Sequence, residues 1–254
     1  WQNPVFPEQS GWRKGVDDIL VENGFQYTMI DSPLLGNASL MGVYEDKPVE
    51  MGELRYERTP YVPYRLASGL QLFVRDHITG YQVWSRHQGY PGDGSYLEFH
   101  KMKDTSGIKY WRITGPDAEL GDKVVYDPAK AAEMVRKHAA HFAGLVAQLG
   151  LNFRNSHGLS SMLVSPFDAE LFGHWWFEGP TWLDFLFRKM DFDQSTVRAV
   201  TPTEYLKMFP LGLFKKMDQA AKAGLSGVNL YYKIINQRVI ERAEKLNIEV
   251  LAWT

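Results

Sequence analysis

Ser161-Met-Leu-Val-Ser-Pro166 is a short apolar run that ends in proline, and Phe167-Asp-Ala-Glu-Leu-Phe-Gly173 follows it directly. An apolar run of this length, bounded by proline, is typical of a buried strand. Apolar residues at helical spacing predict helices on both sides of it, over 127–149 and 180–190. Helix, strand and helix in this order favour an α/β fold with a mainly parallel sheet.

The same alternation continues toward both ends of the chain. A long loop is expected over 32–69 and irregular structure over 86–127, with Asp127 as N-cap and Pro128 as the first residue of the next helix. The fold class predicted is therefore α/β, a (β/α) barrel that is seven-stranded or incomplete. A partial barrel is expected over 1–209, and a βαβ segment over 210–254 completes or extends it. The remaining helices are expected over 13–23, 202–208, 214–224 and 237–247, and the strands over 25–31, 70–76, 197–201, 228–231 and 248–253.

Composition excludes several classes of protein. The 254 residues include no Cys, which rules out disulfide scaffolds, thiolate metal sites and a Cys nucleophile. The 28 basic residues against 30 acidic ones give a net charge of −2, so no nucleic-acid partner is expected. No apolar run approaches the ~18 residues of a membrane span. The start, Trp1-Gln-Asn-Pro4, lacks Met and resembles no signal peptide, so we expect a processed or excised piece of a cytoplasmic protein.

Aromatic residues make up 14% of the chain, with 8 Trp and 13 Tyr. Flat apolar rings with a polar edge suit the C–H faces of sugars, which favours a carbohydrate ligand. The alternative is that these rings pack in a large core. The seven His residues show no metal-binding spacing, and neither a phosphate-binding loop nor a GxSxG motif occurs, so metal ligation, nucleotide binding and the common Ser hydrolases lack support.

Two carboxylates are candidates for catalysis. Asp168 lies just beyond the apolar run 161–166, where parallel α/β folds place their reactive groups. It could serve as a general acid or, alternatively, as a helix N-cap over packed Trp rings. Glu8, within Phe6-Pro-Glu-Gln9, could be a second such carboxylate or a solvated side chain near a chain end. Retaining glycosidases need two carboxyl groups about 5–5.5 Å apart.

The stretch Ser165-Pro-Phe-Asp-Ala-Glu-Leu-Phe-Gly-His-Trp-Trp-Phe-Glu-Gly179 resembles a conserved region of glycoside hydrolase family 57, and is most similar to its 1,4-α-glucan branching enzymes. The resemblance extends over about residues 5–209. It also includes Gln82-Val-Trp-Ser85, Gly89-Tyr-Pro-Gly-Asp93, Tyr96-Leu-Glu-Phe-His100, Gly107-Ile-Lys-Tyr-Trp-Arg-Ile-Thr-Gly115 and Val200-Thr-Pro-Thr-Glu-Tyr205.

This resemblance implies a (β/α)7 barrel, a retaining mechanism, an α-glucan as partner, and neither metal nor organic cofactor. It assigns the acid/base to Asp168 and the nucleophile to Glu8, although Pro7-Glu-Gln-Ser-Gly-Trp12 has one residue more than the family pattern. The other residues that it suggests as substrate-binding are Trp84, Tyr90, Trp111, His174, Trp175 and Trp176.

The end of the chain resembles a different family. Gly227-Val-Asn-Leu-Tyr-Tyr232 and Ile248-Glu-Val-Leu-Ala-Trp-Thr254 are similar to the end of a glycerophosphodiester phosphodiesterase barrel, whose His-Arg-Gly metal signature this chain lacks. We therefore expect a chimeric chain or a fragment. The predicted function is a branching-type retaining enzyme acting on α-glucans; the alternative is an incomplete barrel that binds glucan or is purely structural.

Overall fold

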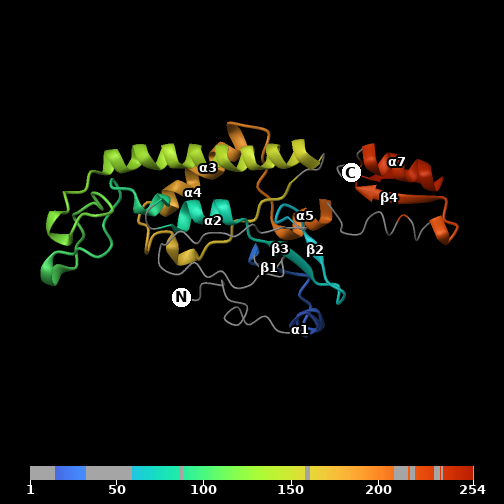
Figure 1. The fold of residues 1–254 in the computed structure, drawn as a ribbon, viewed down its shortest axis with the longest axis horizontal. Coiled ribbons are helices and arrows are strands. Elements are labelled where there is room, and N and C mark those ends of the chain that lie inside the picture. Colours follow the sequence, from blue (N-terminus) through green and yellow to red (C-terminus); the bar gives the residue numbers. More distant parts are fainter. Residues whose placement is uncertain are drawn as a thin grey trace. The chain divides into compact units, whose positions relative to one another are not determined.

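A computed structural model describes residues 15–32, 59–85, 88–157, 161–208, 217, 221–231, 235 and 237–253 (Figure 1). The chain divides into two compact units, residues 1–199 and 200–254. Each unit is described by itself below.

The first unit contains a three-stranded sheet in the order β1-β3-β2. Strands β1 (Tyr27–Ile30) and β3 (Gln71–Val74) are parallel, and the short β2 (Tyr64–Arg65) lies antiparallel to β3. Helix α1 (Val16–Glu22) precedes β1. Because β1 and β3 are parallel, their C-terminal ends lie at the same edge of the sheet.

A helical layer forms the main core of this unit. Helix α3 (Pro128–His157) packs along α4 (Gly179–Phe192) and also contacts α2 (His77–Trp84), as Figure 1 shows. The predicted start of α3 is confirmed, since the Asp127 carboxylate accepts hydrogen bonds from the N–H groups of Ala129 and Lys130. The largest buried residues of this core are Tyr90, Tyr96, Phe142, Trp176 and Trp182.

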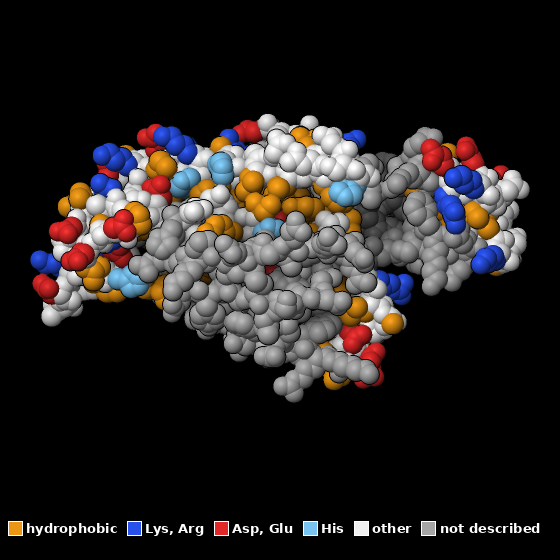
Figure 2. All heavy atoms as spheres, viewed as in Figure 1, with side chains coloured by type: hydrophobic (Ala, Val, Ile, Leu, Met, Phe, Trp, Pro, Cys, Tyr) orange, Lys and Arg blue, Asp and Glu red, His pale blue; other side chains and the backbone are white. Residues whose placement is uncertain are grey.

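Short 3-10 turns connect these elements: η2 (Tyr90–Gly92), η3 (Asp104–Ser106), η4 (Leu120–Asp122) and η5 (Ala169–Leu171). Isolated bridges such as Trp111 to Val125 hold the irregular segment 97–126 together. Figure 2 shows acidic and basic side chains interspersed over the visible face of this segment and of α3.

The second unit is a small parallel βαβ arrangement. Strands β4 (Gly227–Tyr231) and β5 (Glu249–Trp253) pair over their full length, and α7 (Gln237–Leu246) connects them. Helix α5 (Pro202–Met208) precedes them, and its predicted capping residue Thr201 is confirmed by bonds between its side chain and Glu204. The buried residues of this unit are Met217, Val239, Ala243 and Ile248.

Two predicted strands are wrong. Residues 161–166 belong to no strand, because the Met162 N–H and the Val164 carbonyl bond to different segments, at Tyr61 and Asp76, and Pro166 has no N–H to donate. Residues 197–201 are not a strand either, since the Gln194 side chain binds both the N–H and the C=O of Val197. Helix α2 was not predicted.

The α/β class is confirmed, but no closed or seven-stranded barrel is found among the described residues. The sheet of the first unit is mixed, because β2 returns antiparallel to β3 through the turn at Gly69, whose φ is +99°. In the part of the chain that the structure describes, no helix is both long and apolar enough to cross a membrane.

The α3–α4 contact predicts where the first unit is most sensitive to substitution. Trp182→Ala is expected to lower the free energy of unfolding by about 3–5 kcal/mol, because the ring is 0% exposed and its removal leaves a cavity. Urea unfolding followed by circular dichroism measures this loss. Phe192→Ala on the same helix, 76% exposed, is the matched control and should stay within about 0.5 kcal/mol of the unmodified chain. Equal losses in both variants would contradict the assignment of the core.

Candidate functional site

Asp168 lies at the start of the loop 167–178, which connects the extended segment 161–166 to α4. It is exposed, and although it occupies the N-cap position of η5, its carboxylate makes no capping hydrogen bond. The carboxylate therefore takes no part in capping the turn that follows it. Of the two alternatives that the sequence left open, the capping role is the one that this geometry does not support.

The segment before Asp168 is fastened to the corner between β3 and α2. The Asp76 N–H donates to the Val164 carbonyl at 2.8 Å, and the hydroxyls of Thr79 and Ser165 lie 2.6 Å apart. Asp76 follows β3 and is completely buried, and its Oδ2 accepts both the N–H and the O–H of Thr79 at 2.7 Å. This corner thus fixes the chain three residues before Asp168.

The end of the loop is held by a second buried carboxylate. Glu178 is 6% exposed, and its Oε1 accepts the Leu97 N–H at 3.0 Å, while its Oε2 has no partner at hydrogen-bond distance among the described residues. Burial raises the pKa of Glu178, and the neighbouring Tyr126 hydroxyl and the Leu97 N–H oppose this shift only in part. The loop therefore lies between two buried carboxylates, Asp76 and Glu178.

Polar groups also gather at the C-terminal edge of the sheet. Asp31 follows β1 and Arg75 follows β3, beside Asp76. Burial raises the pKa of Asp31, and the positive charges of Arg75 and His77 partly offset that effect. Sequence reasoning missed Asp31, Asp76 and Glu178 as site residues. For the two Asp residues the signal was available, because Asp31 directly follows β1 and Asp76 lies two residues after the end of β3.

The predicted aromatic residues separate into buried and accessible groups. Trp176 is 1% exposed and packs between Tyr96 and Trp182, with ring centroids 5.6 and 5.3 Å away. Tyr90 is 4% exposed, and its hydroxyl lies 2.6 Å from Nδ1 of His141. Neither ring has an exposed face, so the structure places both in the core.

Trp84, at the end of α2, and Trp175 remain accessible, with 39% and 42% of their surface exposed. Trp111 is half-buried in the segment 97–126, where the Lys101 amino group lies 4.6 Å from its ring centroid. Glu8 lies outside the described residues. Within the described ranges, no cluster of His, Asp and Glu side chains is suited to hold a metal ion.

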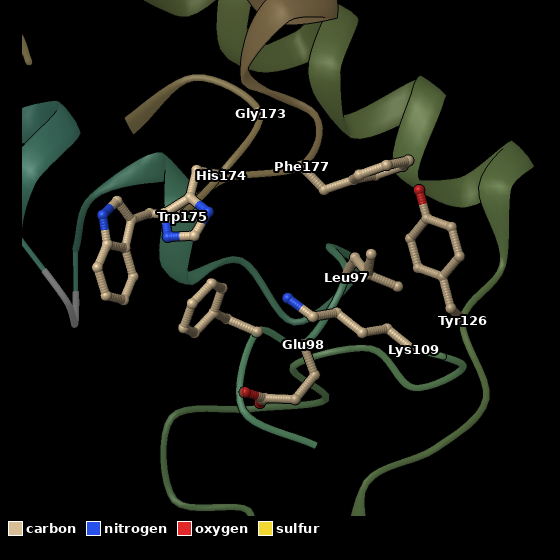
Figure 3. Close-up of a pocket in the computed structure, with 9 residues that line it drawn as sticks. Leu97, Glu98, Lys109, Tyr126, Gly173, His174, Trp175 and Phe177 are labelled. Atoms are coloured by element: carbon tan, nitrogen blue, oxygen red, sulfur yellow. The ribbon is translucent and has the colours of Figure 1, made fainter. Parts of the chain in front are cut away.

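His174 and Trp175 line a pocket of about 350 Å³ between the loop and the segment 97–126 (Figure 3). The Lys109 side chain lies among the aromatic rings, with its amino group 4.0 Å from the Phe99 centroid. Trp175 is oriented by a hydrogen bond from its Nε1 to Glu170 at 3.3 Å. The lining residues are Leu97, Glu98, Phe99, Lys109, Tyr126, Gly173, His174, Trp175 and Phe177.

A buried ion pair supports one wall of this pocket. Lys123 Nζ lies 3.0 Å from Glu98 Oε2, and both side chains are less than a tenth exposed. Burial disfavours ionisation of Glu98, but bonds from the His100 N–H and the Lys123 ammonium outweigh it and lower the pKa. The segment 97–126 therefore has a fixed polar anchor despite its irregular backbone.

Asp168 is thus an exposed carboxylate on a fastened loop that also carries the accessible ring of Trp175. Residues 3–217 match the glycosyl hydrolase family 57, and the chain belongs to this family.

Two relatives by sequence bear the names of branching enzymes. The chain is 43% identical over 172 residues to a 1,4-alpha-glucan branching enzyme of Thermococcus kodakarensis, a match covering 67% of this chain and 25% of the relative. It is 40% identical over 186 residues to a probable 1,4-alpha-glucan branching enzyme of Mycobacterium tuberculosis, covering 73% and 32%. The chain thus spans between a quarter and a third of these relatives.

Solved structures agree with the sequence matches. The crystal structure of the Thermococcus branching enzyme with glucose superimposes with a TM-score of 0.70 at 39% identity, over 78% of this chain and 35% of that one. A branching enzyme from Pyrococcus horikoshii gives a TM-score of 0.67 at 38% identity, over 83% and 35%.

The raised pKa of Glu178 predicts a pH-dependent stability. The folded state holds this proton more tightly than the unfolded chain, whose ordinary pKa is 4.5, so stability falls as the pH rises from there through the raised value. Glu178→Gln removes this loss and keeps an oxygen for the Leu97 N–H.

We therefore expect the Tm of Glu178→Gln, relative to the unmodified chain, to increase steadily as the pH rises from 4 to 8. Calorimetry across this range measures it. Glu119→Gln, at an exposed position, should show no such trend. A difference that shrinks with rising pH would contradict the burial of an ionisable Glu178.

Proposed function

We propose that this chain is part of a retaining enzyme that acts on α-glucans in the manner of the branching enzymes. The observation that carries the proposal is the exposed, uncapped Asp168 on a loop held at both ends by buried carboxylates. Membership in the glycosyl hydrolase family 57 and the similarity to named branching enzymes support it. The proposal includes a complete (β/α)7 barrel and a location in the cytoplasm.

In the first step, the Glu8 carboxylate attacks the anomeric carbon of a glucose unit while Asp168 protonates the departing glycosidic oxygen. The C–O bond breaks and a glycosyl ester on Glu8 forms. In the second step, the Asp168 carboxylate takes the proton from an acceptor hydroxyl, whose oxygen attacks the anomeric carbon and releases Glu8. A glucan 6-hydroxyl as acceptor gives a branch, and water gives hydrolysis.

Accessible aromatic rings supply the surface for the glucan. Trp84 and Trp175 each expose about two fifths of their surface, which leaves ring area for the apolar face of a sugar. Trp111 and His174 are further candidates, in the segment 97–126 and at the pocket. By excluding water around the glycosyl ester, such rings favour transfer over hydrolysis.

A second candidate is a glucan-binding piece without turnover. It rests on the accessible rings of Trp84 and Trp175, which can contact a sugar without any catalytic step. The two candidates share the aromatic surface and differ in catalysis, so a turnover assay and a binding assay together separate them.

Asp168→Asn is expected to lower turnover on amylose by at least about 10³-fold, because the amide can neither give nor take the transferred proton. Iodine absorbance and reducing ends are followed together: falling colour with few new reducing ends identifies transfer. Asp191→Asn, an exposed Asp on α4, is the control and should retain full activity. Equal rates in Asp168→Asn and the unmodified chain would overturn the assignment.

Glucan binding can be measured without turnover by affinity electrophoresis in glycogen. Trp84→Ala is expected to weaken retardation about five- to tenfold, since one aromatic contact contributes on the order of 1 kcal/mol. Phe192→Ala, which removes an exposed ring from α4, should leave it unchanged. Retardation without turnover in the unmodified chain supports the binding piece, and no retardation at all contradicts both candidates.

A further inference from the structure

The hydroxyl of Thr79 is the centre of a directed hydrogen-bond chain. The Thr79 hydroxyl donates its single O–H proton to Asp76 Oδ2, 2.7 Å away. The Thr79 oxygen is then an acceptor for the Ser165 O–H at 2.6 Å. The order is therefore Ser165 to Thr79 to Asp76, and the last two side chains are completely buried.

This chain reaches Asp168 through a stiff connection. Only two residues, Pro166 and Phe167, separate the anchored Ser165 from Asp168. Pro166 has a fixed φ and restricts Ser165 to extended conformations, so this connection has little freedom. On the far side, the Leu171 N–H donates to the Asp168 carbonyl at 3.1 Å, and the Leu171 side chain is 4% exposed. A shift at Ser165 would therefore move Asp168.

We propose that Asp76, Thr79 and Ser165 are positioning residues for Asp168, and that their hydrogen-bond chain holds its loop in the geometry required for proton transfer. The catalytic part of this inference rests on the proposed function. The claim that these hydrogen bonds hold the loop does not rest on it, because the hydrogen bonds are present whether or not the protein has turnover.

Capping of α2 does not require the Thr79 hydroxyl. The Thr79 backbone N–H alone gives Asp76 its N-cap hydrogen bond, at 2.7 Å. Thr79→Val keeps this N–H and the side-chain volume but removes the link to Ser165. Thr79→Ser keeps the link and is the conservative rescue. Thr181→Val, at an exposed position of α4, is the matched control.

The experiment uses the full chain and two kinds of readout. Hydrogen exchange followed by mass spectrometry reports on the amides of residues 167–171, and initial rates on amylose over a range of pH give kcat, KM and the pH profile. In Thr79→Val we expect exchange in 167–171 to be roughly tenfold faster. We expect kcat to fall about ten- to hundredfold with little change in KM, and the pH limb that depends on Asp168 to shift. Thr79→Ser and Thr181→Val should behave as the unmodified chain does.

Each outcome decides the inference. Unchanged exchange in Thr79→Val overturns it, whatever the activity. Faster exchange with unchanged kcat in Thr79→Val overturns the positioning role. A fall in kcat in Thr79→Ser as large as that in Thr79→Val also overturns it, since Thr79→Ser keeps the hydroxyl. If the unmodified chain has no turnover, the proposed function fails separately, and the exchange data alone decide whether Thr79 holds the loop.

Discussion

The buried carboxylate of Asp76 is the constraint on which the site depends. The Asp76 side chain is 0% exposed, and a buried polar group without any hydrogen bond is strongly unfavourable. Its Oδ2 accepts hydrogen bonds from both the N–H and the O–H of Thr79. These bonds fix the turn between the end of β3 and the start of α2. The Thr79 hydroxyl has then given its only proton to Asp76, so its oxygen can accept the O–H of Ser165. This hydrogen bond joins the segment 161–166 to the corner between β3 and α2.

The loop 167–178 owes its shape to polar groups at its ends and apolar groups in its middle. Asp76 and Glu178 bind backbone N–H groups, of Thr79 and Leu97, that apolar side chains would leave unpaired. Between them, Leu171 and Trp176 are buried, and the Trp176 N–H bonds to the Leu171 carbonyl at 2.8 Å. Asp168 is thereby left exposed on a loop whose two ends are fastened, which is the support that the proposed proton transfer needs.

Sequence reasoning succeeded where local signals are strong. The capped start of α3 at Asp127 and the parallel pairing of β4 with β5 follow from residue type and spacing alone. It missed α2, whose signal is a single capping Asp after a strand, and it read 161–166 as a strand because extended backbone and sheet backbone share one apolar pattern. Side-chain links across 86 residues, such as Thr79 to Ser165, leave no trace in local spacing.

The aromatic excess has two explanations, and the structure divides the rings between them. Trp175 and Trp176 are neighbours in sequence, yet one is 42% exposed and the other 1%, because the loop turns one ring toward the pocket and the other toward α4. Composition therefore could not separate accessible rings from core rings. The two uses depend on each other: Trp176 and Trp182 fix the loop from beneath, and this packing is what lets Trp175 hold an exposed orientation without losing its position. In the proposed function, the ring that would contact the glucan is therefore positioned by the core under it.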